Sequence, residues 1–214
     1  MPTAAREGVI KFALAFRPGP PPPAAMLLEL ESWRDIFRRL GLLGQIPGRY
    51  DGLGFGNLSR RARGDGFIIS GTQTGGLARL TPAHYVTVTA CDPLRDRIEA
   101  EGAVHPSSEA LSHGVLYQAD PRIDWVMHLH SPEIFGACSR LHLPVTDPQA
   151  PYGTPAMAAE IRRVAPAAGW PGLLAMGGHE DGILAFGATA PETGSLVVRT
   201  LAIAVAAALP PALD

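Results

Sequence analysis

The chain has 214 residues, of which 46% are hydrophobic and 18% are charged, and its formal net charge is −2. This length and composition are those of a single globular domain with its own core, and they exclude a disordered chain. No basic excess exists, which argues against a nucleic-acid partner because binding to phosphate backbones needs clustered positive charge.

Lysine is almost missing from the sequence. Lys11 is the only lysine among the 18 positively charged residues, so the other 17 are arginines. Enzymes that form a Schiff base need a catalytic lysine, which nearly eliminates aldolases of that type and pyridoxal phosphate enzymes. No phosphate-binding loop of the GxxxxGK type occurs either.

No targeting or membrane segment is recognisable. The apolar stretch near the N-terminus contains Lys11 and ends at Arg17 without a small-residue cleavage site, and the apolar C-terminal stretch is interrupted by Arg199. Cys91 and Cys138 are far apart and have no metal-binding or redox spacing. We therefore expect two free thiols, a cytoplasmic location and no membrane partner.

Apolar periodicity and turn residues predict strands and helices along the whole chain. In the first half, the predicted elements are a strand over 9–16, a helix over 24–43, a glycine-rich loop over 48–56, and strands over 66–70 and 85–89. In the second half, they are helices over 106–118, 132–139, 154–164 and 191–209, and strands over 123–130, 173–176 and 183–186. This irregular alternation favours an α/β fold with a mixed or largely antiparallel sheet over a doubly wound one.

The sequence His128-Leu129-His130 lies in one of the predicted strands. Residues i and i+2 of a strand point to the same face, so the two imidazoles are placed to bind one divalent metal ion. A bare HxH pair is more often two ordinary histidines, but the apolar neighbours of this pair argue against an open surface. His179 lies in a glycine-flanked turn between two apolar strands, where it is either an exposed turn tip or a third ligand.

The sequence Pro106-Ser107-Ser108-Glu109 precedes a predicted helix. Serines that cap the helix and an acid that complements its dipole explain the motif structurally. The same groups can bind an anion and move a proton near a metal ion. His113 shares the helix face of Glu109, and we place it behind the site or in the core.

Two further turns carry neutral donors suited to a phosphate or carboxylate. One is Gly56-Asn57-Leu58-Ser59, and the other follows a strand as Ser70-Gly71-Thr72. Each turn alone is a weak signal. Arg60, Arg61 and Arg63 follow the first turn, and a charge run of this kind favours a solvated face.

The order of these motifs resembles the class II aldolase/adducin family, most closely its zinc-dependent fuculose-phosphate aldolases. Five motifs follow one another between residues 24 and 209: GNLS, a strand ending in SGT, PSSE before a helix, HLHS after a strand, and a GH turn. The resemblance implies a three-layer α/β/α sandwich around a mixed, mainly antiparallel sheet. We therefore assign residues 1–23 to an N-terminal strand and a proline-rich linker, and residues 24–214 to a domain of this family.

The resemblance also implies a site, a cofactor and an assembly. Zinc or another divalent metal would be bound by His128, His130 and His179, with Glu109 as the acid/base. The substrate phosphate would be bound by Asn57, Ser70, Gly71, Ser107 and Ser108. Members of the family usually form homotetramers with active sites at subunit interfaces.

The sequence departs from the family's sugar-phosphate aldolases in three places. The third histidine lies in GHE where they commonly have NHG, and SGTQTGG stands where they often have a TPSG-like turn. Those aldolases use a catalytic tyrosine after the short helix that follows HxH. The corresponding segment of this sequence has only Tyr152, which lies closer to the next predicted helix than that tyrosine would.

We therefore predict a metal-dependent lyase that acts on a small hydroxylated carbonyl compound, a sugar phosphate, through a metal-stabilised enediolate. The alternatives are an epimerase, dehydratase or decarboxylase of the same family, or a non-catalytic adducin-like interaction module.

Overall fold

A computed structural model describes residues 9–62 and 64–209, in which eight strands form a single sheet. The strands are β1 (Ala13–Pro18), β2 (Asn57–Arg61), β3 (Phe67–Ser70), β4 (Tyr85–Asp92), β5 (Arg97–Gly102), β6 (Trp125–His130), β7 (Gly172–Ala175) and β8 (Gly182–Gly187). Their order across the sheet is β1-β5-β4-β3-β2-β6-β8-β7. Only β1 and β5 pair in parallel, so the sheet is mixed and mainly antiparallel, as predicted.

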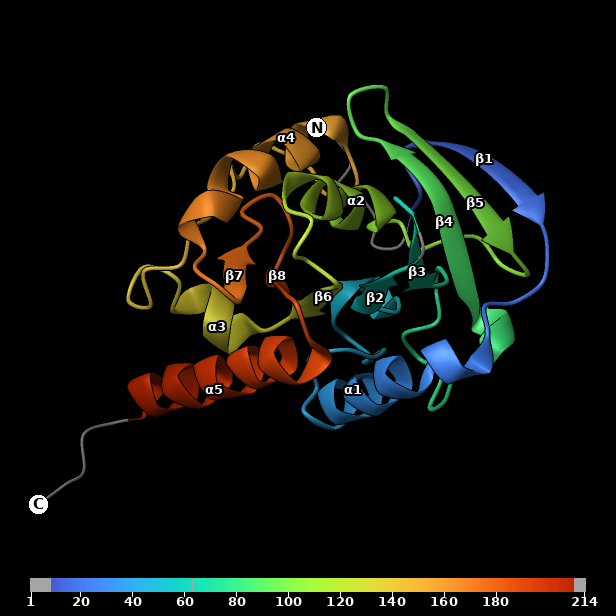
Figure 1. The fold of residues 1–214 in the computed structure, drawn as a ribbon. Helices are drawn as coiled ribbons and strands as arrows, with labels where there is room; N and C mark the ends of the chain where they lie inside the picture. The colour runs from blue at the N-terminus through green and yellow to red at the C-terminus, as the bar shows by residue number, and fades with distance from the viewer. Residues whose placement is uncertain (1–8, 63, 210–214) are drawn as a thin grey trace, which may run out of the picture.

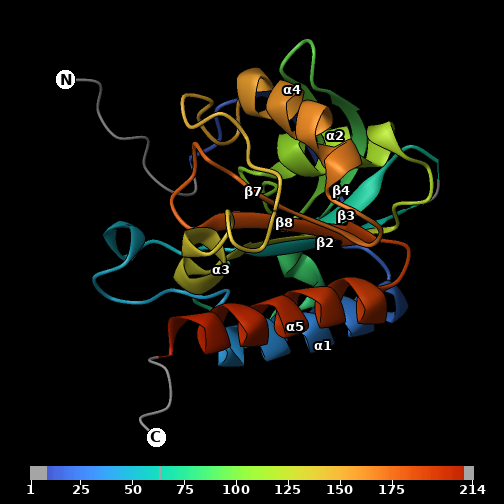
Figure 2. The ribbon, with the colours of Figure 1, turned by 90° about the vertical axis from the view of Figure 1, so that its left-hand side faces the viewer.

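Helices cover both faces of the sheet and make the predicted three layers. The helices are α1 (Leu28–Arg39), α2 (Ala110–Ala119), α3 (Pro132–Gly136), α4 (Pro155–Val164) and α5 (Ala190–Ala208). With the sheet seen edge-on, α1 and α5 lie side by side below it, and α2 and α4 lie above it (Figures 1 and 2).

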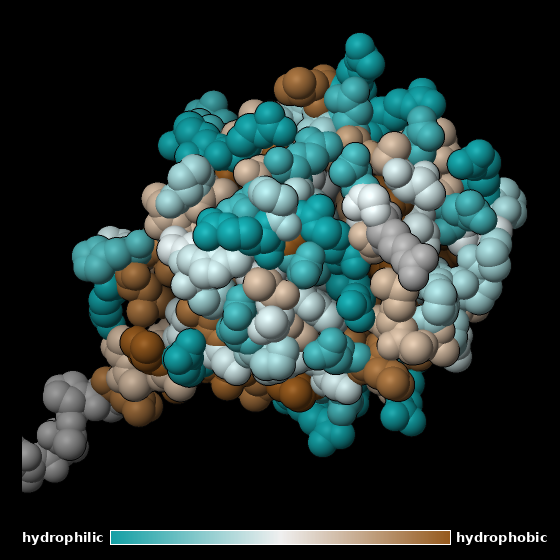
Figure 3. Space-filling model, in the orientation of Figure 1, coloured by the Kyte–Doolittle hydropathy of each residue, from teal (hydrophilic) through white to brown (hydrophobic). Residues whose placement is uncertain are grey.

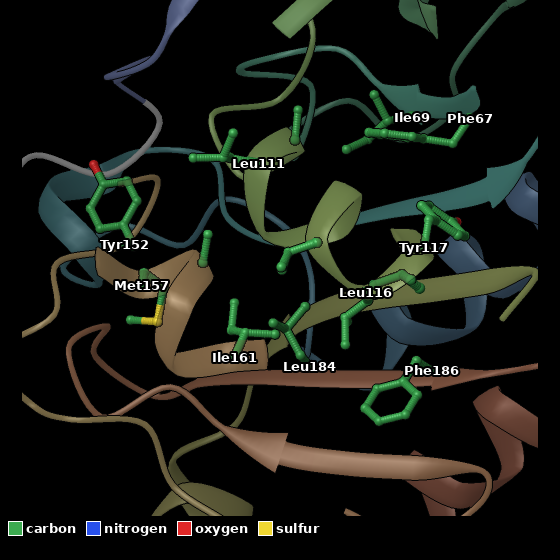
Figure 4. Packing of buried hydrophobic residues seen from close by; sticks show 14 of the residues in the cluster. Phe67, Ile69, Leu111, Leu116, Tyr117, Tyr152, Met157, Ile161, Leu184 and Phe186 are labelled. Atoms are coloured by element: carbon green, nitrogen blue, oxygen red, sulfur yellow. The ribbon is translucent and has the colours of Figure 1, made fainter. Parts of the chain in front are cut away.

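Each face of the sheet has its own apolar core. In β6, Val126 contributes to the core under α2 and α4, whereas Met127 and Leu129 contribute to the core over α1 and α5. The first of these cores packs Leu111 and Leu116 of α2 against the sheet (Figure 4). Because side chains alternate along a strand, His128 and His130 lie on the face of Val126, toward α2.

Most predicted elements are present with shifted ends, but one helix is shorter than predicted, and strands β2 and β5 were not predicted. The helix predicted over 24–43 begins only at Leu28, after a short 3₁₀ turn, and Gly41 follows its end with φ of 72°. Strand β2 was not predicted, because NLSRR is polar and follows a glycine-rich loop. It is nevertheless a central strand, paired on both sides by β3 and β6.

The arginines after the GNLS motif do not form a solvated face, so that expectation is wrong. Arg60 donates to the Met26 carbonyl oxygen at 3.2 Å and stacks over Trp125. Arg61 donates to three carbonyl oxygens around the end of α2 and pairs with Asp124 at 3.3 Å. Both side chains are half-buried and satisfy backbone carbonyl groups that would otherwise need other donors. Arg63 lies outside the described residues.

The division of the chain at residue 23 stays a prediction. Strand β1, which that division separates from the domain, pairs with β5 in the same sheet. Residues 1–8 and 210–214 lie outside the described part of the chain. Cys91 and Cys138 are free thiols, as expected. Among the described residues, no helix has the length and apolar character needed to span a bilayer.

The second half of α5 presents apolar side chains to the surface. Ile203 is 57% exposed, Val205 is 43% exposed and Leu209, just after the helix, is 65% exposed. Hydrophobic residues gather at the lower left of the space-filling view, where α5 ends (Figure 3).

Candidate metal centre

The fold brings the three predicted histidine ligands together. His128 and His130 come from β6, and His179 comes from the turn between β7 and β8. Their candidate ligand atoms all lie within 4.8 Å of one another, and all three residues are buried. The His179 ring stacks on His128 at 4.9 Å and meets the edge of His130 at 4.7 Å.

The turn that carries His179 depends on a close backbone approach. A Cβ atom on Gly178 would collide with the carbonyl oxygen of Ala150, so only glycine fits at this position. The His179 amide donates to the Met176 carbonyl oxygen at 2.9 Å, and Gly182 closes the turn by donating to the His179 carbonyl oxygen at 3.0 Å. These contacts direct the imidazole back toward β6.

The chemistry of the triad fits a divalent metal ion. The Nδ1 atom of His128 lies 3.2 Å from the Ile183 carbonyl oxygen, which can only accept, so Nδ1 carries the proton and Nε2 keeps its lone pair. That Nε2 lies 3.1 Å from Nε2 of His130. Two nitrogens bound tetrahedrally to one zinc ion at about 2.0–2.1 Å lie about 3.3 Å apart. The spacing therefore matches a shared ion.

Burial keeps two of the imidazoles neutral. Removal from water lowers the pKa of His128 and of His130 well below its ordinary value, and the neighbouring histidines lower it further. Metal ions bind neutral imidazole, so no proton has to be displaced from these two ligands near neutral pH.

Glu109 lies beside the triad and is fully buried. Its Oε1 is 3.8 Å from Nδ1 of His179, and its Oε2 accepts a hydrogen bond from the Ser112 hydroxyl at 2.7 Å. The helix predicted from residue 106 begins instead at Ala110, so Glu109 occupies the N-cap position without capping the helix through its side chain. The carboxylate therefore faces the histidines and does not lie on a solvated first turn.

The predicted anion-binding residues also come together, from three segments. Asn57 pairs with His128 in the β2–β6 register. Gly71 forms a bridge with Pro106, and the Ser107 amide donates to the Ser70 carbonyl oxygen at 3.2 Å. A Cβ atom on Gly71 would lie 2.6 Å from a methyl carbon of Val104, so the close approach of these segments requires glycine. Ser107 and Ser108 are buried.

A buried arginine shapes the turn that follows Gly71. Arg34 of α1 is only 2% exposed and donates to the carbonyl oxygens of Thr74 at 2.9 Å and Gly75 at 3.3 Å. Its charge is paired with Glu31, which also accepts from the Leu80 amide at 3.0 Å. Helix α1 thereby holds the SGTQTGG segment in place.

His113 belongs to a hydrogen-bonded group behind the site. Its Nδ1 lies 2.6 Å from the Ser59 hydroxyl, which lies 2.7 Å from the Tyr117 hydroxyl. All three residues are buried, and burial lowers the pKa of His113 to about 3. This group connects α2, which follows Glu109, to β2, which carries Asn57.

The lowered pKa of His113 predicts a specific acid sensitivity. Between about pH 6.5, where the unfolded chain takes up the proton, and about pH 3, where folded His113 does, only the unfolded state is protonated at this residue. The stability contributed by neutral His113 is complete above pH 6.5 and is lost as pH falls through this window, by up to about 1.4 kcal/mol per pH unit. His113→Asn, which can still bond to Ser59, is expected to show a shallower decline in the free energy of unfolding.

Urea denaturation of the metal-free proteins between pH 6.5 and 4 measures this difference. The remaining histidines and carboxylates are common to both proteins, so they cancel in the comparison. Parallel declines in the free energy of unfolding would contradict the assignment of the acid sensitivity to His113.

Sequence reasoning missed the residues that flank the triad on the His130 side. The Tyr50 ring meets His130 edge-on at 4.5 Å, and its hydroxyl donates to Asp181 Oδ2 at 2.8 Å and accepts from Arg49 at 2.7 Å. Tyr50 and Asp181 have φ angles of 49° and 57°, a left-handed backbone conformation that residues other than glycine rarely adopt. Strained backbone of this kind concentrates at functional sites. No motif in the sequence signalled these contacts.

Tyr152 and Lys11 flank the triad beside His179. Tyr152 stacks on His179 at 4.5 Å within the same chain, and it lies at one edge of the core cluster (Figure 4). The ammonium group of Lys11 lies 3.3 Å from the centre of the Tyr152 ring and donates to the Tyr152 carbonyl oxygen at 2.9 Å. The only lysine of the chain therefore belongs to the surroundings of the site.

Comparison with known proteins agrees with this arrangement. Residues 48–204 match the family described as the Class II Aldolase and Adducin N-terminal domain. The chain belongs to the class II aldolase/adducin family. This family is typically dependent on a divalent metal, and the histidine triad of this member is able to bind one. A search of curated proteins gave no match.

Solved structures share the fold of this class II aldolase/adducin protein. An L-fuculose 1-phosphate aldolase is 21% identical, with a TM-score of 0.64 over 91% of this chain and 92% of its own. The L-fuculose-1-phosphate aldolase from Thermus thermophilus is 18% identical, with a TM-score of 0.60 over 89% of this chain and 100% of its own. YgbL from Escherichia coli, described as an aldolase/epimerase/decarboxylase candidate, is 18% identical, with a TM-score of 0.62 over 85% of this chain and 87% of its own.

Proposed function

We propose that this protein is a metal-dependent carbon–carbon lyase of the class II aldolase type, and that its substrate is a small hydroxylated carbonyl compound, a sugar phosphate. The observation that carries the proposal is the meeting of three buried imidazoles with one buried carboxylate, Glu109. Solved relatives include L-fuculose 1-phosphate aldolases, which supports the choice of substrate class.

His128, His130 and His179 would hold the metal ion, zinc or another divalent cation. When bound, the ion would supply a Lewis acid for the carbonyl oxygen and a neighbouring hydroxyl oxygen of the substrate. Glu109 would move the proton, because its Oε1 faces the triad while the Ser112 hydroxyl holds its Oε2. Burial of the carboxylate excludes water from the transfer.

Asn57, Ser70, Gly71, Ser107 and Ser108 would bind the substrate phosphate. Asn57 supports this role because its side-chain amide carries the neutral Nδ2 donor and lies on the strand that pairs with His128. Neutral donors at these positions need no lysine.

A non-catalytic adducin-like module is the second candidate, and the presence of both the triad and Glu109 argues against it. The cytoplasmic location stays a prediction. We also propose a homotetramer whose interfaces complete the site, and the exposed apolar side chains of α5 support association of this kind.

Metal analysis followed by a substrate panel tests the function. The purified protein, dialysed against zinc, is expected to retain about one ion per chain, because three protein ligands and an open position are typical of catalytic zinc. A sugar-phosphate panel, assayed with and without a chelator, is expected to give turnover that the chelator removes. A protein that retains no divalent metal would contradict the proposal and favour the adducin-like candidate, which need bind none. Metal binding without turnover on any sugar phosphate would contradict the proposed substrate class.

A further inference from the structure

Arg49 lies at the rim of the triad with most of its hydrogen-bond donors unused. Its side chain is 31% exposed, and its guanidinium lies over the rings of Tyr50 at 5.0 Å and Phe55 at 5.5 Å. A guanidinium has five N–H groups, and within the described residues Arg49 uses one of them, on the Tyr50 hydroxyl. Its nearest carboxylate oxygen, on Asp181, is 3.9 Å away, which is too far for a hydrogen bond.

Two strained turns hold this guanidinium in a fixed position. The Tyr50 hydroxyl joins Arg49 to Asp181, and the backbone of the Tyr50 turn is closed by hydrogen bonds from Gly52 to Arg49 at 2.8 Å and from Leu53 to Tyr50 at 3.0 Å. The side-chain amide of Gln45 holds the same turn through the Gly52 carbonyl oxygen at 2.7 Å. The fork of donors is therefore ordered before any ligand binds, which lowers the entropic cost of binding.

The charges around the triad leave a positive excess once a metal ion is present. Arg49 and Lys11 contribute two positive charges, which the negative charges of Glu109 and Asp181 offset, and the carboxylate of Glu180, next to His179, is exposed to water. A divalent ion adds two positive charges to an enclosed site where water screens poorly. An anionic ligand would balance this excess, and a neutral ligand would not.

We propose that Arg49 binds an oxyanion of the substrate, a carboxylate or phosphate group carried next to the oxygen atoms that the metal centre binds. The planar fork of a guanidinium matches two oxygens of either group. Arg49 lies near His130, whereas Glu109 lies near His179, so the anion and the proton-transfer group lie beside different histidines of the triad. This inference rests on the proposed metal-dependent function and defines its substrate class as an acidic hydroxy compound.

Calorimetric titration of the zinc-loaded protein tests the inference without an activity assay. The probes are glycolate, hydroxymethylphosphonate and the neutral amide glycolamide, which share the hydroxymethyl group and differ in the group offered to Arg49. Glycolate or the phosphonate is expected to bind more tightly than glycolamide, and the tighter of the two identifies the oxyanion. Arg49→Gln is expected to weaken that probe by about 10- to 100-fold and to leave glycolamide unchanged.

Controls separate this contact from general charge and from folding. Arg95→Gln makes the same charge change at a residue whose side chain is 84% exposed in the β4–β5 turn, and it is expected to bind every probe as the unmodified protein does. Arg49→Lys keeps the charge but loses the fork, so it is expected to recover only part of the affinity. Zinc content and the unfolding midpoint of each variant report whether the site is intact.

The outcomes distinguish this inference from the proposed function. Equal anion binding by the unmodified protein and a zinc-loaded Arg49→Gln variant would overturn the role of Arg49 and leave the metal centre standing. Equal binding of glycolamide and both anions by the unmodified protein would likewise overturn the role of Arg49 and leave the metal centre standing. Failure of the unmodified protein to bind zinc at all would overturn the proposed function and this inference with it.

Discussion

Glu109→Gln is expected to lower turnover by about 10²–10⁴-fold, because the amide cannot accept or return the proton that the carboxylate moves. The two side chains have the same shape, and the amide oxygen of the variant can still accept from Ser112. Removal of a buried charge beside His179 leaves the free energy of unfolding similar or higher, since no buried carboxylate then has to be desolvated. Steady-state kinetics on the substrate found by the panel measures the loss of turnover. Zinc analysis of the same variant shows whether metal binding is kept.

Glu29→Gln is the matched control for this experiment. Glu29 is an exposed acid in the first turn of α1, so its replacement removes only a favourable interaction with a helix dipole, worth about 0.3–1 kcal/mol. This variant is expected to keep full turnover. Near-native turnover by Glu109→Gln would show that Glu109 has only a structural role at the start of α2.

His128→Ala is expected to abolish stoichiometric zinc binding. The variant keeps two of the three imidazoles, and it loses the Nε2 atom that faces His130 at 3.1 Å. A ligand present at about 1,000 times its dissociation constant stabilises the folded state by about 4 kcal/mol, so the unmodified protein should unfold at a higher urea concentration when zinc is added. His128→Ala should show no such shift.

His142→Asn controls for the general loss of a histidine. His142 is exposed and has a φ of 53°, a conformation that asparagine tolerates, so this variant should bind zinc and gain stability from it as the unmodified protein does. Elemental analysis measures the zinc content of each variant. Urea denaturation with zinc and with a chelator measures the stability that each variant gains from zinc. Full zinc content in His128→Ala would remove His128 from the ligand set.

The irregular alternation of strands and helices predicted a mixed or largely antiparallel sheet, and the family resemblance implied its three layers and the residues that meet at its centre. The strand alternation around His128 and His130 places both imidazoles on one face, because the side-chain period of a strand is two. Apolar periodicity located α4 and α5 to within a few residues, because burial of one face is what stabilises such helices. The order of the motifs identified the family, which the match over residues 48–204 then confirmed.

Only the tertiary structure decided what surrounds the triad. Strand β2 is polar in sequence and becomes a central strand because β3 and β6 pair with it on both sides, which no local pattern encodes. Tyr50 and Asp181 are 131 residues apart in the chain, and their hydrogen bond forms because two turns with left-handed backbone meet beside His130. Long-range contacts of this kind depend on sheet register and loop closure, so Arg49 and Lys11 gain their places at the site from the folded chain and not from a motif.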